Sequence, residues 1–236
     1  MEITDRQKTI LEKLIDEYIE TACPVSSQSL EKKYDFGIGS AMIRIELERL
    51  ADDGFLLQPF VSAGRVPTDT GYRFYVDKIL ADKVPEYRGI EKIEQTIEDE
   101  KEDTLKLAAE LADLLARSSS SIAMLHLSEE DLFFKEGWEE VMRQPEFADR
   151  DLLFCFGDFL KDLEEKISGW DINSEMKIFI GKENPNKKGE NFATISAACH
   201  LPGKKKGVVS LVGPKRMPYE KNISLVHSLL EIMDNF

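Results

Sequence analysis

Three helical segments followed by a hairpin, all within residues 4–68, constrain the fold of this chain more than any other feature. Thr4 and Gln7 have the spacing of a capping box, and apolar residues then recur at helical intervals. Ser40 is the expected N-cap of the third segment, and Gly54 stands where a helix-ending glycine belongs. The three helices are predicted over residues 4–20, 26–34 and 40–53.

The segment after Gly54 has the pattern of a hairpin that leads into another helix. Its parts are predicted at 55–61 (strand), 62–64 (turn) and 65–68 (return strand). Gly64 and Arg65 are therefore expected at the tip, where a cation can reach phosphates and a glycine keeps the backbone thin. Three helices and a hairpin in this order predict a winged helix-turn-helix, with the hairpin as the wing. The next helix is expected to open at Thr68 or Thr70.

Beyond residue 80 the pattern changes to one long helix and then a sheet with helices. Apolar residues at spacings of three and four run from Ile90 to Leu114, and four serines at 118–121 end that pattern. The later strands are predicted at 122–127, 177–181, 191–199 and 207–213, and the later helices at 129–144, 150–167 and 219–233. Turn segments between the last three strands favour an antiparallel meander.

The charge of the chain bears on its partners. The net charge is −14, which argues mildly against nucleic acid, because phosphate binding relies on Lys and Arg. Residues 1–78 hold ten Lys or Arg and fourteen Asp or Glu, a net charge of −4, so most of the acidic excess lies elsewhere. A local basic surface is compatible with this distribution. The run Lys204–Lys206 is interpreted as a solvated turn.

The composition also indicates a compartment and excludes several classes of protein. With 236 residues, 42% of them hydrophobic, the chain has enough apolar material for two domains. No run of eighteen apolar residues is present, and the polar, acidic start does not resemble a signal peptide, so we expect no membrane association. Cys23, Cys155 and Cys199 are far apart and lack CxxC spacing, which favours reduced thiols in a cytoplasmic protein.

Catalytic and metal-binding templates are absent from the sequence. There is no GxSxG, HExxH or Walker motif, so we predict no enzyme activity, no catalytic residues, no metal and no cofactor. His126, His200 and His227 are isolated on apolar segments and are interpreted as packed core residues. Arg44 and Arg49 can contact DNA or can pair with acidic neighbours, namely Glu48, Asp52 or Asp53.

Several segments together resemble the heat-inducible transcription repressors of the HrcA family. They are QKTILEKLIDEYIETACPVSSQSL, GIGSAMIRIELERLADDGFLLQP and SAGRVPTDTGYRFYVD near the start, and LFFKEGWEEVMRQPEF, IFIGKEN and GVVSLVGPKRMPYEKNISLV farther on. The segment SAGRVPTDTGYRFYVD is the most specific of them. The resemblance covers most of the chain, with the middle as the exception.

The resemblance implies a winged-helix domain joined to a GAF-like domain, with a dimerisation insert between them. It implies repression of chaperone operons through an inverted-repeat operator, CIRCE, with support from the chaperonin, and no metal or catalytic centre. By position it places Ser40, Ala41, Arg44 and Arg49 in the recognition helix, and Gly64 and Arg65 in the wing.

The chain departs from the family pattern at two places. Where the family favours Thr-Ile-Arg-Asn, this sequence has Met42-Ile43-Arg44-Ile45; Ile45 can offer only an apolar contact, for instance to a thymine methyl group, where asparagine can read adenine. The chain is also about a third shorter than a usual member, and the missing length falls between residues 127 and 133, where the insert belongs. The stripe over 90–115, which includes Ile93 and Ile97, is then the candidate dimer seam; alternatively it packs on the sheet of its own chain.

The sequence thus predicts an α+β protein: a winged helix-turn-helix, a connecting helix and a reduced GAF-like α/β domain with an antiparallel sheet. The domains are expected at residues 1–80 (DNA binding), 81–117 (connecting and dimerisation helix) and 118–236 (GAF-like). The predicted function is a dimeric repressor of heat-shock genes that binds an inverted-repeat operator through Ser40, Ala41, Arg44, Ile45, Arg49, Gly64 and Arg65. The alternative is an interaction or sensor module whose winged helix no longer reads an operator.

Overall fold

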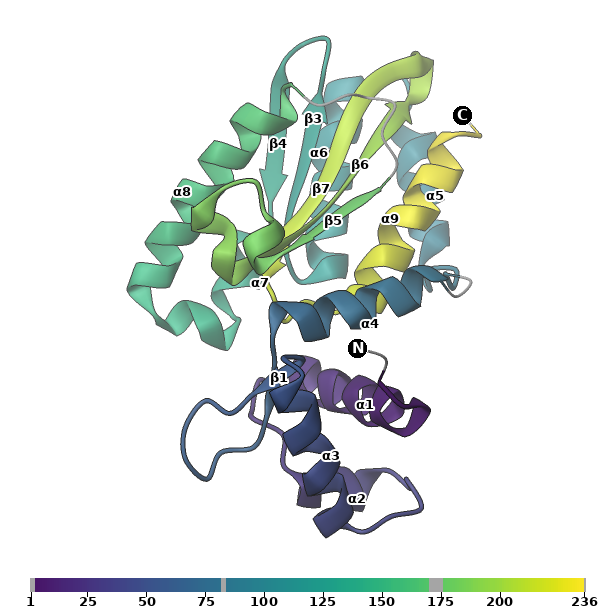
Figure 1. Cartoon of the computed structure of the whole chain (residues 1–236). Coiled ribbons are helices and arrows are strands. Elements are labelled where there is room, and N and C mark those ends of the chain that lie inside the picture. The colour runs from purple at the N-terminus through teal and green to yellow at the C-terminus, as the bar shows by residue number, and fades with distance from the viewer. Residues whose placement is uncertain (1–2, 82–83, 170–175, 236) are drawn as a thin grey trace. The chain divides into compact units, whose positions relative to one another are not determined.

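The chain folds into two compact units of helices and antiparallel strands, and is therefore an α+β protein (Figure 1). The structure is a computed structural model that describes residues 3–81, 84–169 and 176–235. We call Met1–Asp82 the N-terminal unit and Lys83–Phe236 the C-terminal unit.

The N-terminal unit contains the predicted three helices, a very short strand pair and a further helix. These elements are α1 (Asp5–Thr21), α2 (Ser27–Lys33), α3 (Ser40–Asp52), β1 (Leu56–Leu57), β2 (Val66–Pro67) and α4 (Asp69–Ala81). The predicted capping box is confirmed, because the Gln7 amide donates to the Thr4 hydroxyl and the Thr4 amide donates to the Gln7 side chain. Gly54, at φ +82°, follows α3 as expected. The predicted N-cap Ser40 is wrong by one residue: Gly39 is the N-cap, and Ser40 is the first helical residue.

Helices α1, α2 and α3 share one apolar core. Its fully buried members include Ile10, Leu11, Leu14, Ile15, Leu30, Ile43 and Leu50. The predicted core face of α3, with Ile43, Leu47 and Leu50, is confirmed. Helix α4 is fastened to α1 by the Tyr75 hydroxyl, which donates to Asp16 at 2.7 Å. Its first turn is capped by the Thr68 hydroxyl, which accepts from the Gly71 amide at 3.2 Å.

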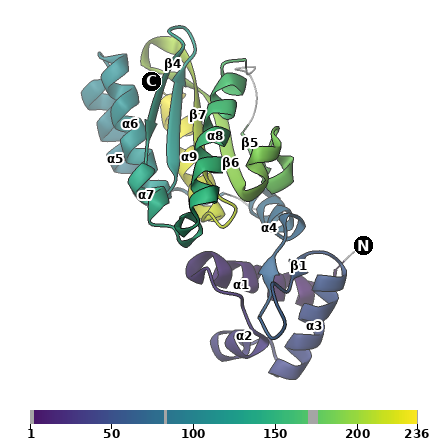
Figure 2. The same ribbon diagram turned by 90° about the vertical axis from the view of Figure 1, so that its left-hand side faces the viewer.

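The C-terminal unit is a five-stranded antiparallel sheet with helices on both faces (Figures 1 and 2). The helices are α5 (Ile90–Glu100), α6 (Thr104–Ser119), α7 (Trp138–Met142), α8 (Arg150–Ile167) and α9 (Tyr219–Met233). The strands are β3 (Ile122–Leu127), β4 (Leu132–Glu136), β5 (Lys177–Ile180), β6 (Phe192–Leu201) and β7 (Lys205–Pro214), in the order β4-β3-β7-β6-β5. The predicted antiparallel meander of the last three strands is confirmed.

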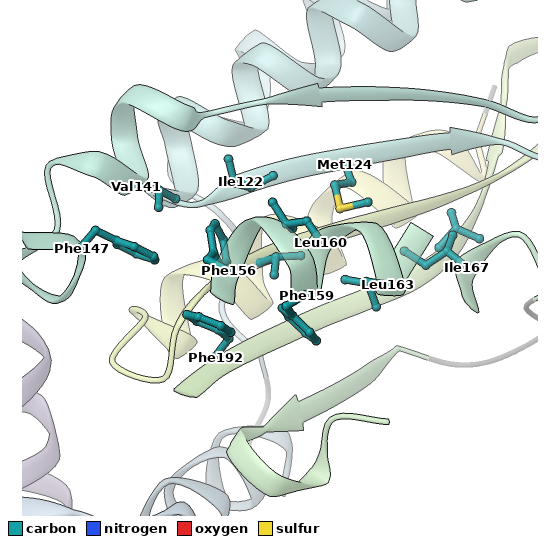
Figure 3. Close-up of a cluster of buried hydrophobic side chains, with 12 residues drawn as sticks. Ile122, Met124, Val141, Phe147, Phe156, Phe159, Leu160, Leu163, Ile167 and Phe192 are labelled. Carbon is teal, nitrogen blue, oxygen red and sulfur yellow. The ribbon is translucent and has the colours of Figure 1, made fainter. Parts of the chain in front are cut away.

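Helix α8 covers one face of this sheet, while α6 and α9 cover the other. Figure 3 shows side chains of α8 beside those of the strands, where they form an apolar cluster with Phe147 and Phe192. The rings of Phe156 and Phe192 lie 4.8 Å apart between centroids. Such aromatic contacts add to the stabilisation that burial of the rings provides.

The long helix expected from residue 90 onward is wrong, because the chain forms two helices there. Residues 101–103 interrupt the helix, and the Asp103 carboxylate starts α6 by accepting from the Leu105 and Lys106 amides, each at 3.1 Å. Helix α5 folds back against α6 and α9, so that Ile93 and Ile97 are buried in their own chain. Of the two alternatives for the stripe, packing within the chain is therefore the one observed. The prediction that Ile93 and Ile97 form a dimer seam is wrong, because both side chains are buried in their own chain.

The helix predicted over residues 129–144 is also wrong. Its first half is strand β4, which pairs with β3 from Ala123↔Glu136 to Leu127↔Leu132. Gly137, at φ +106°, separates β4 from the short helix α7, and an added Cβ there would lie 2.3 Å from the Ser121 carbonyl oxygen. Only residues 128–131 join β3 to β4. The place where the missing length was predicted, and where the insert belongs by resemblance, is therefore a short hairpin connection.

Candidate nucleic-acid interface

A groove of about 600 Å³ runs along the N-terminal unit between α2, α3 and the loop of residues 58–65 that joins β1 to β2. Its walls come from three segments that are distant in sequence. The lining residues are Val25, Ser26, Ser27, Gln28, Arg44, Leu47, Glu48, Gln58, Val61, Ser62, Ala63, Gly64 and Arg65. Hydroxyl, amide and guanidinium donors thus face a common space, together with one carboxylate.

The loop is closed on its inner side by a bridge between Val25 and Arg65. The Val25 amide donates to the Arg65 carbonyl oxygen at 2.9 Å, and the Arg65 amide donates to the Val25 carbonyl oxygen at 2.8 Å. Gly64 lies so close to this bridge that an added Cβ would be 2.4 Å from the Val25 carbonyl oxygen. Gly64 is therefore needed for a close approach within the chain.

Two expectations for the hairpin are corrected by this arrangement. Gly64 and Arg65 are not at the tip, because Arg65 is held against Val25 near the base of the loop. The expected strands over 55–61 and 65–68 shrink to a ladder of two residues each, β1 and β2. The physical reason is that the return segment divides its backbone hydrogen bonds between the first strand and Val25.

The apex of the loop consists of Phe60 and Val61, which the sequence analysis did not single out. The Phe60 residue is 65% exposed and Val61 is 91% exposed. The turn is fixed by the Ala63 amide, which donates to the Phe60 carbonyl oxygen at 3.0 Å, and by the Gln58 side chain, which donates to the Ala63 carbonyl oxygen at 3.0 Å. The signal in the sequence was two apolar residues directly before the small residues of the predicted turn.

Arg65 is the electrostatically unusual residue of the groove. Its Nε atom is buried and has no hydrogen-bond partner, and its side chain forms no ion pair with any residue that the structure describes. A buried donor without an acceptor costs folding free energy.

The two arginines of α3 are paired within their own helix. Arg44 Nε lies 3.1 Å from Glu48 Oε1, which confirms one of the two alternatives for this residue. Arg49 Nη1 lies 3.3 Å from Glu46 Oε1, a carboxylate that the prediction did not name. Both arginine side chains are largely exposed, at 75% and 61%. The Arg44–Glu48 pair lies on the helix surface and is weak, so a phosphate can compete for the Arg44 guanidinium group. Glu46 is buried, so its pair with Arg49 costs more to break.

The outer face of α3 is partly apolar. Ile45 is 40% exposed and Met42 is 42% exposed, while Ala41 is exposed and Ser40 is half-buried. Ile45 thus lies off the core face, as the periodicity predicted. Its role in reading a base stays a prediction.

Of the three histidines, only His126 matches the expected core position. It is buried beneath Phe133, with ring centroids 4.2 Å apart, and its Nε2 lies 3.0 Å from Asp131 Oδ1. His200 is exposed and His227 is half-buried, so the core interpretation is wrong for both. His200 lies near the end of β6, and His227 lies on α9.

A cysteine and a lysine side chain of the C-terminal unit that could carry chemistry are buried and paired, respectively. Burial raises the pKa of the Cys199 thiol to about 12, and all three cysteines are free. Lys205 in the expected solvated turn pairs with Glu130 at 2.8 Å. Within residues 3–81, 84–169 and 176–235, no cluster of three His, Cys, Asp or Glu side chains could hold a metal ion. Over the same ranges, no helix combines the length and apolar character needed to cross a membrane.

Comparison with known proteins gives the family. Residues 76–223 match the family model described as the HrcA protein C terminal domain. The heat-inducible transcription repressor HrcA of Lachnoclostridium phytofermentans is 24% identical over 341 residues, which cover 100% of this chain and 98% of the relative. The HrcA repressor of Thermoanaerobacter pseudethanolicus is 52% identical over 80 residues, 34% of this chain and 23% of the relative.

A solved structure shares the fold. It is described as the crystal structure of a hypothetical protein at 2.2 Å resolution, and it matches with a TM-score of 0.76 at 19% identity over 99% of this chain and 97% of that chain. The alignment with the first repressor is far longer than the 236 residues of this chain, which is therefore a shortened relative. The family model covers more than half of the chain, and the chain belongs to the HrcA family, a family of transcription repressors and not of enzymes.

Proposed function

We propose that this protein is a transcription repressor of heat-shock genes that binds duplex DNA through its N-terminal unit, folded as a winged helix-turn-helix over residues 1–80. The observation that carries the proposal is the groove beside α3, in which the Arg65 guanidinium group has no acidic partner among the described residues. Family membership supports the same function, since the relatives named above are transcription repressors.

In the proposed complex, one phosphate strand lies in the groove and α3 lies in the adjacent major groove. Arg65 would contact a phosphate from the groove wall, and Arg44 and Arg49 would exchange their glutamate partners for phosphates or base edges. Ser40, Ala41 and Ile45 would face the bases, with Ile45 against a thymine methyl group. Gly64 would act indirectly, because it allows the Val25 bridge that positions Arg65.

The proposal includes a homodimer and an inverted-repeat operator. Helix-turn-helix dimers place their half-sites about one turn of DNA, roughly 34 Å, or multiples of it apart, and so need a two-fold axis. Because Ile93 and Ile97 are buried within one chain, the contact between copies is proposed for another surface of the GAF-like C-terminal unit or for the winged helix itself. Support of repression by the chaperonin is proposed from the family alone.

A second candidate function is an interaction or sensor module that no longer reads an operator. The observation in its favour is that both exposed arginines of α3 are already neutralised by Glu48 and Glu46. The net charge of −4 over residues 1–78 points the same way.

Binding selection on a pool of random duplex DNA separates the two candidates. The full chain is incubated with the pool at low and at near-physiological salt, and the bound duplexes are sequenced after several rounds. The repressor proposal predicts enrichment of an inverted repeat. Recovery of unrelated sequences at both salt concentrations would contradict it and favour the interaction module.

Two matched variants sharpen the selection. Arg65→Met removes the unpaired cation while keeping a long side chain, and is expected to abolish or strongly reduce enrichment. Arg117→Met makes the same change at an exposed helix arginine of the C-terminal unit, which pairs with Asp113 at 2.9 Å, and is expected to enrich the same repeat as the wild type.

A further inference from the structure

We propose that Phe60 and Val61, the apex of the loop between β1 and β2, form an apolar wedge that enters the minor groove of the operator and opens one base step. The inference rests on the proposed function and adds to it a mode of reading DNA that involves no hydrogen bond. Proteins that insert Phe, Leu, Ile or Met between base steps kink the duplex toward the major groove, and the cost of unstacking is offset by new contacts.

The exposure of the apex is the first observation behind the wedge. Phe60 and Val61 are neighbours in the sequence, and they are 65% and 91% exposed. An apolar pair that protrudes together from a loop is a larger feature than a single exposed apolar residue, and such features mark sites of interaction. Figure 1 shows the loop extending out beyond β1.

The second observation is that the loop is held in shape without a partner. Two hydrogen bonds close the turn around the apex, and the Val25–Arg65 bridge closes its base. Ser62 adopts φ +73°, a conformation that fixes a tight reversal directly after Val61. A loop that is already ordered loses little conformational entropy when it inserts, so its apolar surface can contribute to affinity.

The third observation favours duplex DNA over a lipid surface as the partner of the apex. Val61 and Ser62 line the same groove as Arg44 and Arg65, so a phosphate strand bound by these cations brings a groove of the duplex against the apex. Residues 58–64 contain no charged side chain, and the apex can therefore approach the phosphates without repulsion. A lipid surface would need more apolar area than these two side chains provide.

The test uses the duplex that the wild-type chain enriches from the random pool, labelled at its ends for energy transfer and with 2-aminopurine at successive steps of the half-site. Wild-type protein is expected to bend this duplex and to raise 2-aminopurine fluorescence at one step. Phe60→Ala is expected to lose both signals and to bind about tenfold more weakly, since stacking of one aromatic ring is worth that much. Phe60→Leu, which keeps an apolar wedge, is expected to retain most of the bend.

Two controls distinguish loss of the wedge from loss of stability and from loss of any exposed aromatic ring. Phe154→Ala removes a ring that is 75% exposed on α8 of the C-terminal unit, and should leave bending and affinity unchanged. Since the Phe60 ring packs little against the protein, Phe60→Ala should unfold at the same denaturant concentration as the wild type.

Each failure has its own signature. If Phe60→Ala binds and bends the duplex as the wild type does, the wedge is wrong while the proposed function stands. If Phe60→Ala changes the sedimentation of the free protein and not the bend, the apex is a contact between copies, which also overturns the wedge. If the wild type enriches no duplex, the proposed function fails, and the wedge fails with it.

Discussion

The two units of this protein each contain an arginine that is partly or fully buried, and the surroundings of the two differ. In the C-terminal unit, Arg216 is 9% exposed, and its Nε and Nη2 atoms donate to the two carboxylate oxygens of Glu146 at 2.7 and 3.1 Å. The Gln144 side chain accepts a further bond at 2.9 Å. In the N-terminal unit, Arg65 has a buried Nε without an acceptor and no acidic partner among the described residues.

The comparison separates a cation that maintains a fold from one that is available to a ligand. A bidentate pair matches the planar fork of a guanidinium group to the two oxygens of a carboxylate, and Gln144 accepts a further bond from Arg216. Removing Arg216 would leave Glu146, whose side chain is 24% exposed, without its charged partner, which is destabilising. Arg65 has no acidic partner among the described residues, so its removal leaves no carboxylate uncompensated. We therefore expect the substitution to change the free energy of unfolding little and to weaken the binding of an anionic partner strongly.

The largest expected effect is the loss of the Arg216 pair. Arg216→Met should lower the free energy of unfolding of the C-terminal unit by about 2 kcal/mol, because Glu146 loses both of its charged donors. The measurement is alkylation of Cys199 in urea, since this buried thiol reacts only when the sheet opens. Arg117→Met is the control, and an equal shift in both variants would show that the Glu146 contact does not stabilise the unit.

Gly64→Ala is expected to have the next largest effect, and it acts on the position of Arg65. The added methyl group would lie 2.4 Å from the Val25 carbonyl oxygen, so the bridge must open, at a cost of about 1–2 kcal/mol. Hydrogen exchange at the Val25 and Arg65 amides, which donate across the bridge, should become faster. Gly157→Ala is the matched control, since a Cβ there meets nothing within 4 Å, and it should slightly stabilise α8. Unchanged exchange at both amides in Gly64→Ala would contradict the close approach.

A smaller effect is expected from pH in the N-terminal unit. Burial alone would raise the pKa of the Glu17 carboxyl, but hydrogen bonds from Lys33 at 2.6 Å and Tyr34 at 2.7 Å outweigh burial and lower it. A carboxyl whose pKa is lowered by folding contributes stability above its ordinary pKa, near 4.5, and loses that contribution as the pH falls through the lowered value.

Chemical unfolding of the wild type and of Glu17→Gln at a series of pH values tests this. The difference in stability between the two proteins should be constant near neutral pH and should shrink below about pH 4.5. A difference that is independent of pH down to the acid transition would show that the network of α1 and α2 does not depend on the charge of Glu17.

The contrast between the regions also explains which parts of the structure could be predicted. Helix ends in the N-terminal unit depend on local signals, such as the Thr4–Gln7 capping box and Gly54, and these were predicted correctly or within one residue. The bridge between Val25 and Arg65 joins segments forty positions apart, so no local pattern could reveal that Arg65 leaves the hairpin tip. The exposed apex at Phe60 and Val61 is a consequence of that bridge, and its one local signal was the apolar pair directly before the small residues of the predicted turn.

In the C-terminal unit the errors came from helical periodicity that tertiary contacts override. The apolar stripe after Ile90 was real, but Asp103 begins a second helix within it, so the stripe folds back on itself. The Asp103-Thr104 step was a usable capping signal. The segment over 129–144 has few turn residues besides Gly137, and its first half becomes a strand because the edge of β3 is available for pairing.

If Arg65 is a phosphate contact and not part of the fold, Arg65→Met should change the salt dependence of DNA binding and leave the stability of the protein unchanged. Unfolding in urea should match the wild type to within about 0.5 kcal/mol, because the substitution removes an unpaired cation. Binding to the enriched duplex, followed by fluorescence anisotropy at several salt concentrations, should be weaker. The slope of log affinity against log salt should decrease by about one unit for each bound protomer. An unchanged affinity and slope, with or without a loss of stability, would contradict the account, since Arg65 would then belong to the fold and not to a DNA interface.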